Sequence, residues 1–184
     1  MERHLKEGTI IIKPFAELDF CLDKLTKMEE KKILRTKRYI RFSDCDPMGH
    51  LFNLNYLHYF LEAREDQVRD YYNLDMALLA SKYQWVLLAG THQISYLNPA
   101  MMNEEVEIIS AIIDHSEKWI LVEFQMLDMS EKPKAFMWSK FVSFSLATQS
   151  TAPIPEEMKQ YVNKFSIEKP ASDYDTRFNQ LRHK

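Results

Sequence analysis

The sequence is poor in cysteine and glycine and contains no long apolar run. Two cysteines in 184 residues are too few for a disulfide framework, and they lack the spacing of a metal site. We expect Cys21 and Cys45 to be small buried residues. No apolar stretch approaches the roughly 18 residues that a membrane-spanning helix needs, so we expect no membrane insertion.

No charge of one sign dominates the chain. The formal net charge of −3 gives no bulk electrostatic reason to bind nucleic acid or an anionic membrane. The first residues lack the apolar core of a secretory signal, because Glu7, Lys13 and Pro14 interrupt the short apolar run. We therefore expect a cytoplasmic protein that binds no nucleic acid.

Two chemical signatures are also missing. The sequence has no Gly-x-Ser-x-Gly nucleophile elbow, which excludes an esterase of the α/β-hydrolase type. It has no glycine-rich phosphate-binding loop either. What remains is an ordinary globular composition, with 46% hydrophobic and 28% charged residues, in a chain long enough for one substantial core.

The periodicity of apolar residues predicts one long helix among several strands. The helix is expected from about Asn53 to Tyr72, with a wide apolar stripe and a more charged second half. Strands are expected at residues 33–42, 84–97, 105–114, 119–128 and 135–147. Because short connections between long strands favour antiparallel pairing, we expect an α+β fold in which the helix packs against one curved antiparallel sheet. The sheet edges and the uncovered sheet face favour self-association.

The pattern also suggests three regions along the chain. Residues 1–33 form an N-terminal extension, with a strand expected at 9–13 and a helix from residue 14 to about 32. Residues 34–165 form the main domain and end in a short helix at 156–165. Residues 166–184 form a polar tail that is either disordered or a C-terminal helix.

A cluster of polar residues at 43–50, SDCDPMGH, comes directly before the long helix. In a purely structural interpretation, Asp44 or Asp46 caps a turn, Gly49 adopts a positive φ and Asn53 caps the helix. In a chemical interpretation, a carboxylate ahead of a helix N-terminus lies beside unpaired N–H groups that can stabilise an oxyanion. A base beside an oxyanion site is the minimum equipment for acyl-transfer hydrolysis.

Residues 44–65, DCDPMGHLFNLNYLHYFLEARE, resemble the signature of the hot-dog-fold acyl-CoA thioesterases of the 4-hydroxybenzoyl-CoA thioesterase type. That signature reads Asp-x-Asp-x-x-Gly, often continues as His-Val-Asn-Asn, and leads into an aromatic-rich helix. Matching positions are held by Asp44, Asp46, Gly49, His50, Asn53, Tyr56, Glu62, Ala63 and Arg64. Residues 91–108, THQISYLNPAMMNEEVEI, resemble the family's second strand with its Tyr-x-x-Pro-Ala turn. The resemblance covers roughly residues 36–160.

One departure leaves the substrate subtype open. Phe52 stands where the pattern has its first asparagine, whereas Asn55-Tyr56 resembles the Asn-Tyr of the hydroxybenzoyl branch. The resemblance therefore implies hydrolysis of an acyl-CoA, or of an acyl-carrier-protein thioester, without specifying the acyl group. It implies no metal and no cofactor, since coenzyme A is part of the substrate.

The resemblance also implies roles for individual residues. Asp46 would act as the general base on water or as the direct nucleophile. His50 either orients Asp46 or the substrate, or packs at the helix entry. Backbone amides around residues 52–54 would polarise the thioester carbonyl. Asn53 either caps the helix or lines the catalytic site, and the substrate-binding residues are expected to be Gly49, Phe52, Leu54 and Tyr56. The family fold pairs sheets edge to edge, so we expect a homodimer or tetramer with each site between subunits.

Other functions and residues stay open. A hot-dog dehydratase or hydratase is disfavoured because Asp46 and His50 lie one residue too close together, and a non-catalytic acyl-CoA binder is an alternative. We expect Glu62 and Arg64 to form structural ion pairs. Five large apolar residues either line an acyl tunnel or pack in the core, namely Trp85, Met101, Met102, Trp119 and Trp138. Candidate cations for the nucleotide phosphates are Lys82, Lys118, Lys140 and Arg177.

Overall fold

The computed structural model of the protein describes residues 31–183. The strand expected at residues 9–13 and the helix expected from residue 14 to about 32 lie outside this range, apart from the last positions of that helix. The division of the chain into three regions at residues 33 and 165 remains a prediction.

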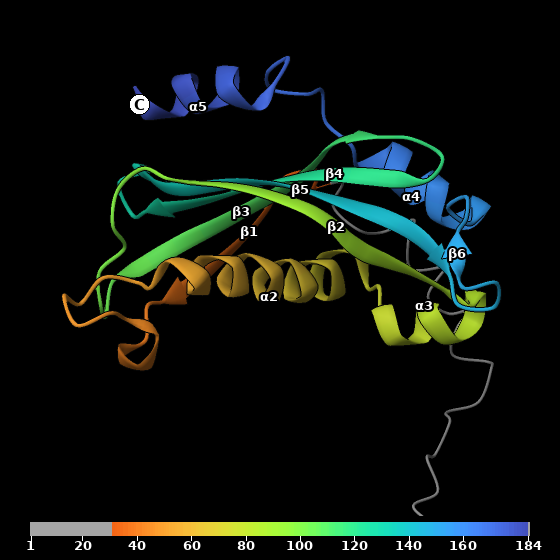
Figure 1. Ribbon diagram of the computed structural model, residues 1–184, viewed down its shortest axis with the longest axis horizontal. Helices are drawn as coiled ribbons and strands as arrows, with labels where there is room; N and C mark the ends of the chain where they lie inside the picture. The colour runs from red at the N-terminus through yellow and green to blue at the C-terminus, as the bar shows by residue number, and fades with distance from the viewer. Residues whose placement is uncertain (1–30, 184) are drawn as a thin grey trace, which may run out of the picture.

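An antiparallel sheet forms the body of the protein (Figure 1). Its strands are β1 (Leu34–Tyr39), β2 (Trp85–Tyr96), β3 (Glu105–His115), β4 (Trp119–Asp128), β5 (Pro133–Ser145) and the short β6 (Ser150–Thr151). The order is β1-β3-β4-β5-β2, so the consecutive strands β3, β4 and β5 pair in the middle. β1 and β2 form the two edges in the described part of the chain. The short β6 pairs antiparallel with the end of β5. The five long strands confirm those predicted from the sequence, with ends shifted by a few residues.

Helix α2 (Asn53–Tyr72) confirms the predicted long helix and lies along one face of the sheet (Figure 1). Its residues Tyr56, Phe60 and Ala63 are almost completely buried. They pack against sheet residues such as Phe124 and Met137, which are fully buried as well. The centres of the phenyl rings of Phe60 and Phe124 lie 5.6 Å apart. Burial of this stripe between a helix and a sheet is the main source of stability expected for such a fold.

The opposite face of the sheet is covered by helix α5 (Tyr174–Arg182) (Figure 1). Its Tyr174 stacks on Phe136 at 4.6 Å and meets Trp138 edge to face. Arg177 forks onto the buried carboxylate of Glu123, with Nη2 2.7 Å from Oε1 and Nε 3.0 Å from Oε2. Of the two alternatives left open for the polar tail, the helix is therefore the correct one, and it is held in place by aromatic stacking and an ion pair.

Two further helices flank the second half of α2. Helix α4 (Glu156–Phe165) confirms the predicted short helix. Helix α3 (Met76–Tyr83) was not predicted, because its eight residues carry too short an apolar pattern. Its start is nevertheless marked by Asp75, whose carboxylate accepts hydrogen bonds from the N–H groups of Ala77 and Leu78 at 2.8 and 3.1 Å.

Two of the three glycines have clear structural reasons. Gly49 has φ of +79°, a conformation that other residues adopt only with strain. Gly90 lies at the bulge of β2, where a Cβ atom would approach Cγ2 of Val142 to 2.9 Å. Among the helices of residues 31–183, none is long and apolar enough to cross a membrane.

Candidate active site

The loop between β1 and α2 is folded back on itself at Asp46. The N–H of Asp46 donates to the carbonyl of His50 at 2.8 Å, and the N–H of Gly49 donates to the carbonyl of Asp46 at 2.9 Å. Cys45 and Leu51 form an isolated antiparallel bridge at the base of this turn. The positive φ of Gly49 lets the chain reverse within these few residues.

The carboxylate of Asp46 is oriented by backbone amides. Its Oδ1 accepts hydrogen bonds from the N–H groups of Met48 at 2.8 Å and His50 at 3.1 Å. Within residues 31–183 no hydrogen bond is made to Oδ2 of the same group. The side chain is only partly buried. One oxygen is thus fixed by the loop, while the other is not engaged by any described residue.

Helix α2 begins beside this carboxylate without a capping side chain. The residue at the cap position is Phe52, with φ −64° and ψ 135°, and in the described structure its side chain makes no capping bond. Of the two interpretations of Asn53, the helix cap is therefore wrong, because Asn53 is already the first helical residue. Phe52 donates its own N–H to the carbonyl of Asp44 at 3.0 Å.

Two amides at the start of α2 stay available for a ligand. Of the candidates at residues 52–54, Phe52 is occupied, which leaves the N–H groups of Asn53 and Leu54 without a protein acceptor in the described residues. The first turn also contains no acidic side chain. Unpaired amides and the positive end of the helix dipole together make this a site for negative charge.

Asp44 supports the loop, and its carboxylate is already engaged by a hydrogen bond from helix α2. Its Oδ2 accepts a hydrogen bond from the hydroxyl of Tyr59 at 2.8 Å, and its carbonyl accepts one from Nδ2 of Asn55 at 2.9 Å. The Tyr59 hydroxyl also accepts the N–H of Arg41 at 3.1 Å. Burial, with the neighbouring Asp44 carboxylate adding to it, raises the pKa of Tyr59 to about 12. Asp44 therefore holds the loop against helix α2 through its side chain and its carbonyl.

Cys45 lies between the two aspartates and is partly exposed, rather than fully buried as expected. Burial raises the pKa of its thiol, and the Coulomb effect of Asp44 and Asp46 raises it further. A thiol with a raised pKa is protonated at neutral pH and is a poor nucleophile. The Cys45 thiol is therefore a poor candidate for the reactive group of this loop.

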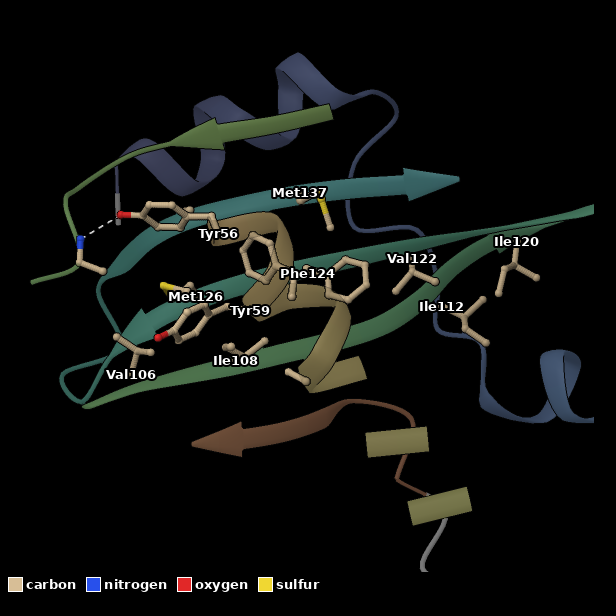
Figure 2. Close-up of a cluster of buried hydrophobic side chains, with 14 of the residues drawn as sticks. Tyr56, Tyr59, Val106, Ile108, Ile112, Ile120, Val122, Phe124, Met126 and Met137 are labelled. Atoms are coloured by element: carbon tan, nitrogen blue, oxygen red, sulfur yellow. Dashed lines mark hydrogen bonds between the residues drawn. The ribbon is translucent and has the colours of Figure 1, made fainter. Parts of the chain in front are cut away.

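The second segment that the sequence singled out is hydrogen-bonded to the Asp46 loop. The N–H of Leu51 donates to the carbonyl of Ala100 at 2.8 Å, and the N–H of Met102 donates to the carbonyl of Gly49 at 2.9 Å. The hydroxyl of Tyr56 accepts the N–H of Ala100 at 3.0 Å (Figure 2). Tyr56 is 2% exposed, so it braces the site from within the core.

Tyr96 was not singled out as a site residue, although it begins the Tyr-x-x-Pro-Ala turn. Its hydroxyl donates to the carbonyl of Asn53 at 3.0 Å, and its ring meets that of Tyr56 edge to face at 5.1 Å. This places the end of β2, an edge strand, against the start of α2. The exposed apolar residues in and around the loop include Phe42, Met48, Phe52, Leu54, Tyr96, Met101 and Met102.

Several other expected contacts are different in the structure. Glu62 lies 3.9 Å from His58, whereas Arg64 forms no ion pair with any described residue. Arg177 is engaged by Glu123 and does not serve as a free cation. Trp138 belongs to the outer face under α5 and not to an inner tunnel.

The remaining candidates divide between surface and core. Lys140 lies over the ring of Trp119 at 4.1 Å, and Lys82 lies 3.5 Å from Glu157. Trp85 is 4% exposed and is part of the core on the α2 side. In the part of the chain that the structure describes, no group of histidine, cysteine or carboxylate side chains is arranged to hold a metal ion.

Solved structures with the same architecture come from several organisms. A 1,4-dihydroxy-2-naphthoyl-CoA thioesterase from Synechocystis aligns with a TM-score of 0.65 at 17% identity, over 71% of this chain and 96% of its own. A Staphylococcus aureus protein solved in complex with CoA gives 0.69 at 12% identity, over 78% and 90%. A 12:0-ACP thioesterase from Umbellularia californica gives 0.69 at 16% identity, over 80% and 55%.

At these identities the likeness establishes the fold, which is the hot-dog fold expected from the sequence. No curated protein matches the chain in sequence. The sequence profile of the thioesterase-like superfamily, however, matches residues 40–162, a span that runs from the end of β1 into α4 and includes the whole Asp46 loop. The chain therefore belongs to the thioesterase-like superfamily.

Proposed function

We propose that the protein hydrolyses an acyl thioester, with Asp46 as the reacting carboxylate. The observation that carries this proposal is the placement of an oriented carboxylate beside the uncapped start of α2. Asp46 is held through Oδ1 by the amides of Met48 and His50. The amides of Asn53 and Leu54 open helix α2, which begins seven residues after Asp46 and directly follows the loop.

These groups have complementary tasks in thioester hydrolysis. The carbonyl oxygen of the substrate accepts hydrogen bonds from the Asn53 and Leu54 amides, which stabilise the negative charge that develops there. Oδ2 of Asp46 takes a proton from water as the water oxygen adds to the carbonyl carbon. The carbon–sulfur bond then breaks, and the leaving thiolate takes the proton from Asp46. A direct attack of Oδ2 on the same carbon, followed by hydrolysis of the anhydride, uses the same geometry.

His50 contributes to this arrangement through its main chain. Its N–H donates to Asp46, and its carbonyl accepts the N–H of Asp46. His50 and Met101 form an isolated antiparallel bridge, which connects the loop to the segment after β2. We therefore assign His50 to positioning Asp46, and the exposed ring of Phe52 beside the cap to contact with the acyl group.

The thiol carrier is proposed to be coenzyme A or acyl carrier protein. A structural relative was solved in complex with CoA, and another is an ACP thioesterase. The apolar surface beside Asp46 suits an acyl group, because apolar contacts are non-directional and grow with the area removed from water. Its members include Phe52, Leu54 and Met101, which are 48%, 70% and 42% exposed.

We further propose that a second copy of the chain completes the site. β2 is a 12-residue edge strand whose middle residues, 88–93, are exposed. Long unpaired edges favour pairing with another strand. Tyr96, at the end of β2, contacts the start of α2, so a partner strand along β2 would lie close to Asp46. Leu88→Lys, which places a charge on this edge, is expected to shift the mass in solution from dimer to monomer and to reduce turnover with it.

A panel of acyl-CoA substrates with detection of the free thiol tests the proposal. We expect turnover of at least one aliphatic or aromatic acyl-CoA, with release of coenzyme A. Tight binding of every acyl-CoA without thiol release would contradict it and would favour the non-catalytic binder. Hydration of an enoyl-CoA, followed by absorbance, would instead favour a hydratase.

A further inference from the structure

The two amides proposed for the oxyanion belong to successive peptide groups at the start of α2. The N–H of Asn53 shares a peptide group with the carbonyl of Phe52, and the N–H of Leu54 shares one with the carbonyl of Asn53. A hydrogen bond accepted at a peptide carbonyl polarises the group and strengthens its N–H as a donor. The hydrogen bonds of these two carbonyls therefore affect how strongly the amides bind a negatively charged oxygen.

The two carbonyls have different partners. The carbonyl of Phe52 accepts the N–H of Asn55 at 2.8 Å, a bond made within the first turn of the helix. The carbonyl of Asn53 accepts the hydroxyl of Tyr96 at 3.0 Å, in addition to the i+4 amide that an α-helix supplies. Tyr96 is the last residue of β2, so this second peptide group is oriented from outside the helix. Because a peptide group is planar, a fixed carbonyl also fixes the direction of the Leu54 N–H.

The ring of Tyr96 is held in place for this contact. It meets the ring of Tyr56 edge to face, with the ring centres 5.1 Å apart. Tyr56 is almost completely buried, and its hydroxyl accepts the N–H of Ala100 (Figure 2). The carbonyl of Ala100 accepts in turn the N–H of Leu51. The support of the Tyr96 ring is thus hydrogen-bonded to the loop that carries Asp46.

The hydroxyl of Tyr96 acts as a hydrogen-bond donor. A carbonyl has no hydrogen to give, so the phenol must donate in its contact with Asn53. Burial raises the pKa of Tyr96, and the phenol therefore keeps its proton at neutral pH. Within residues 31–183 this hydroxyl has no other hydrogen-bond partner. Its removal would leave the aromatic contact with Tyr56 intact.

We propose that Tyr96 is a positioning residue of the thioesterase site, which orients and polarises the peptide group between Asn53 and Leu54 so that the Leu54 N–H binds the oxyanion. This role rests on the hydrolysis proposed for Asp46, and it adds a side chain that acts through the backbone without touching the substrate. β2 is also the edge strand along which a second copy of the chain is proposed to pair. The geometry of the oxyanion site would then depend on the strand at the subunit interface.

Tyr96→Phe removes the hydroxyl and keeps the ring, and steady-state hydrolysis of the best acyl-CoA substrate measures its effect. Polarisation strengthens a hydrogen bond by about 10–30%, and a whole oxyanion donor is worth roughly 10²–10³-fold in kcat. From these magnitudes we expect kcat to fall roughly two- to eightfold with KM unchanged. Tyr39→Phe is the matched control, because Tyr39 ends the other edge strand, β1, and is 65% exposed. It should turn over substrate as the wild type does.

The carbonyl stretch of a bound thioester separates this role from a general effect on the fold. A stronger hydrogen bond to the thioester oxygen lowers the frequency of this stretch. Asp46→Asn is expected to hold the substrate without hydrolysing it, so infrared spectra of a ¹³C-carbonyl acyl-CoA are recorded in that background. We expect the band at lower frequency with Tyr96 than after Tyr96→Phe. Replacement of Tyr96 by 3-fluorotyrosine, a more acidic phenol, should lower the frequency further.

Two sets of outcomes decide the role of Tyr96 and the proposed hydrolysis separately. An unchanged kcat in Tyr96→Phe, an equal loss in Tyr39→Phe, or a carbonyl band at the same frequency with and without the hydroxyl would each overturn the role of Tyr96. If the wild type hydrolysed no acyl-CoA, the proposed hydrolysis would fail instead. The carbonyl band, recorded with the wild type and Tyr96→Phe, would then still decide whether Tyr96 polarises the peptide group.

Discussion

The first turn of helix α2 and its second half carry positive charge in different ways. At its start, the positive charge is the sum of backbone amides beside the Asp46 loop, and no side chain caps the helix in the described structure. In its second half, the positive charge is the side chain of Arg64, which lies among apolar residues. The backbone amides suit a transient oxyanion, whereas the Arg64 guanidinium is held within the fold by the hydroxyl of Ser110. Arg64 follows Asn53 by 11 residues, which is about 16 Å along the helix.

Removal of one backbone amide is the most direct test of the proposed oxyanion site at the start of α2. Asn53→Pro deletes the N–H of the first helical residue, a position that accepts proline without harming the helix. Phe52 already has the extended conformation that a residue before proline requires. We expect kcat for acyl-CoA hydrolysis to fall by roughly 10²–10³-fold, as for loss of one oxyanion donor. The measurement is steady-state turnover.

Asn53→Ala is the matched control for this substitution. It removes the side chain and keeps the amide, so it should retain most of the wild-type turnover. If the alanine variant lost as much activity as the proline variant, the side chain and not the amide would be the active element. Retained activity in both variants would remove Asn53 from the site.

Arg177 and Arg64 are both partly buried, but we expect them to contribute differently to the free energy of unfolding. Arg177 pairs with Glu123, whose side chain is 6% exposed, so Arg177→Met leaves a buried carboxylate without its cation. We expect a loss of roughly 3 kcal/mol in the free energy of unfolding. Arg64→Met leaves no carboxylate behind and should change this free energy by less than about 1 kcal/mol. Urea unfolding measures both, and equal losses would show that Arg64 is structurally paired.

The smallest expected effect concerns Tyr59 beside the Asp46 loop. Its pKa in the folded protein is raised to about 12 from an ordinary value of 10.0, so folding favours the neutral phenol. The contribution of this group to stability is complete below pH 10 and is lost as the pH rises through 12. Tyr59→Phe should cost about 1 kcal/mol at neutral pH, from lost hydrogen bonds, and should flatten the decline in stability between pH 10 and 12.

Tyr174 provides the control on the other face of the sheet, because burial raises its pKa to about 12 as well. Tyr174→Phe should flatten the alkaline decline in the same way and leave turnover unchanged. Tyr59→Phe is expected to reduce turnover modestly through Asp44. An alkaline stability curve that neither substitution alters would contradict the assignment of both phenols.

Much of this fold was readable from local patterns. The α2 stripe and the strand alternation gave the helix and the long strands, and the resemblance around residues 44–65 gave the loop that carries Asp46. The sequence could not show that Phe52, not Asn53, occupies the cap position, because this depends on the hydrogen bonds of the whole loop. It also could not separate Arg64 from Arg177: each is one arginine on a helix, and only the tertiary structure supplies a carboxylate to one of them.

The measurement that tests the central claim most directly is the turnover of Asp46→Asn on the best acyl-CoA substrate. Asparagine keeps the oxygen that accepts the loop amides and removes the carboxylate's ability to take a proton or attack the carbonyl. Asp70→Asn, at an exposed position near the other end of α2, is the control. We predict that Asp46→Asn retains the wild-type unfolding curve and loses nearly all thioester hydrolysis, while Asp70→Asn behaves as the wild type. Wild-type turnover in a folded Asp46→Asn variant would contradict the account.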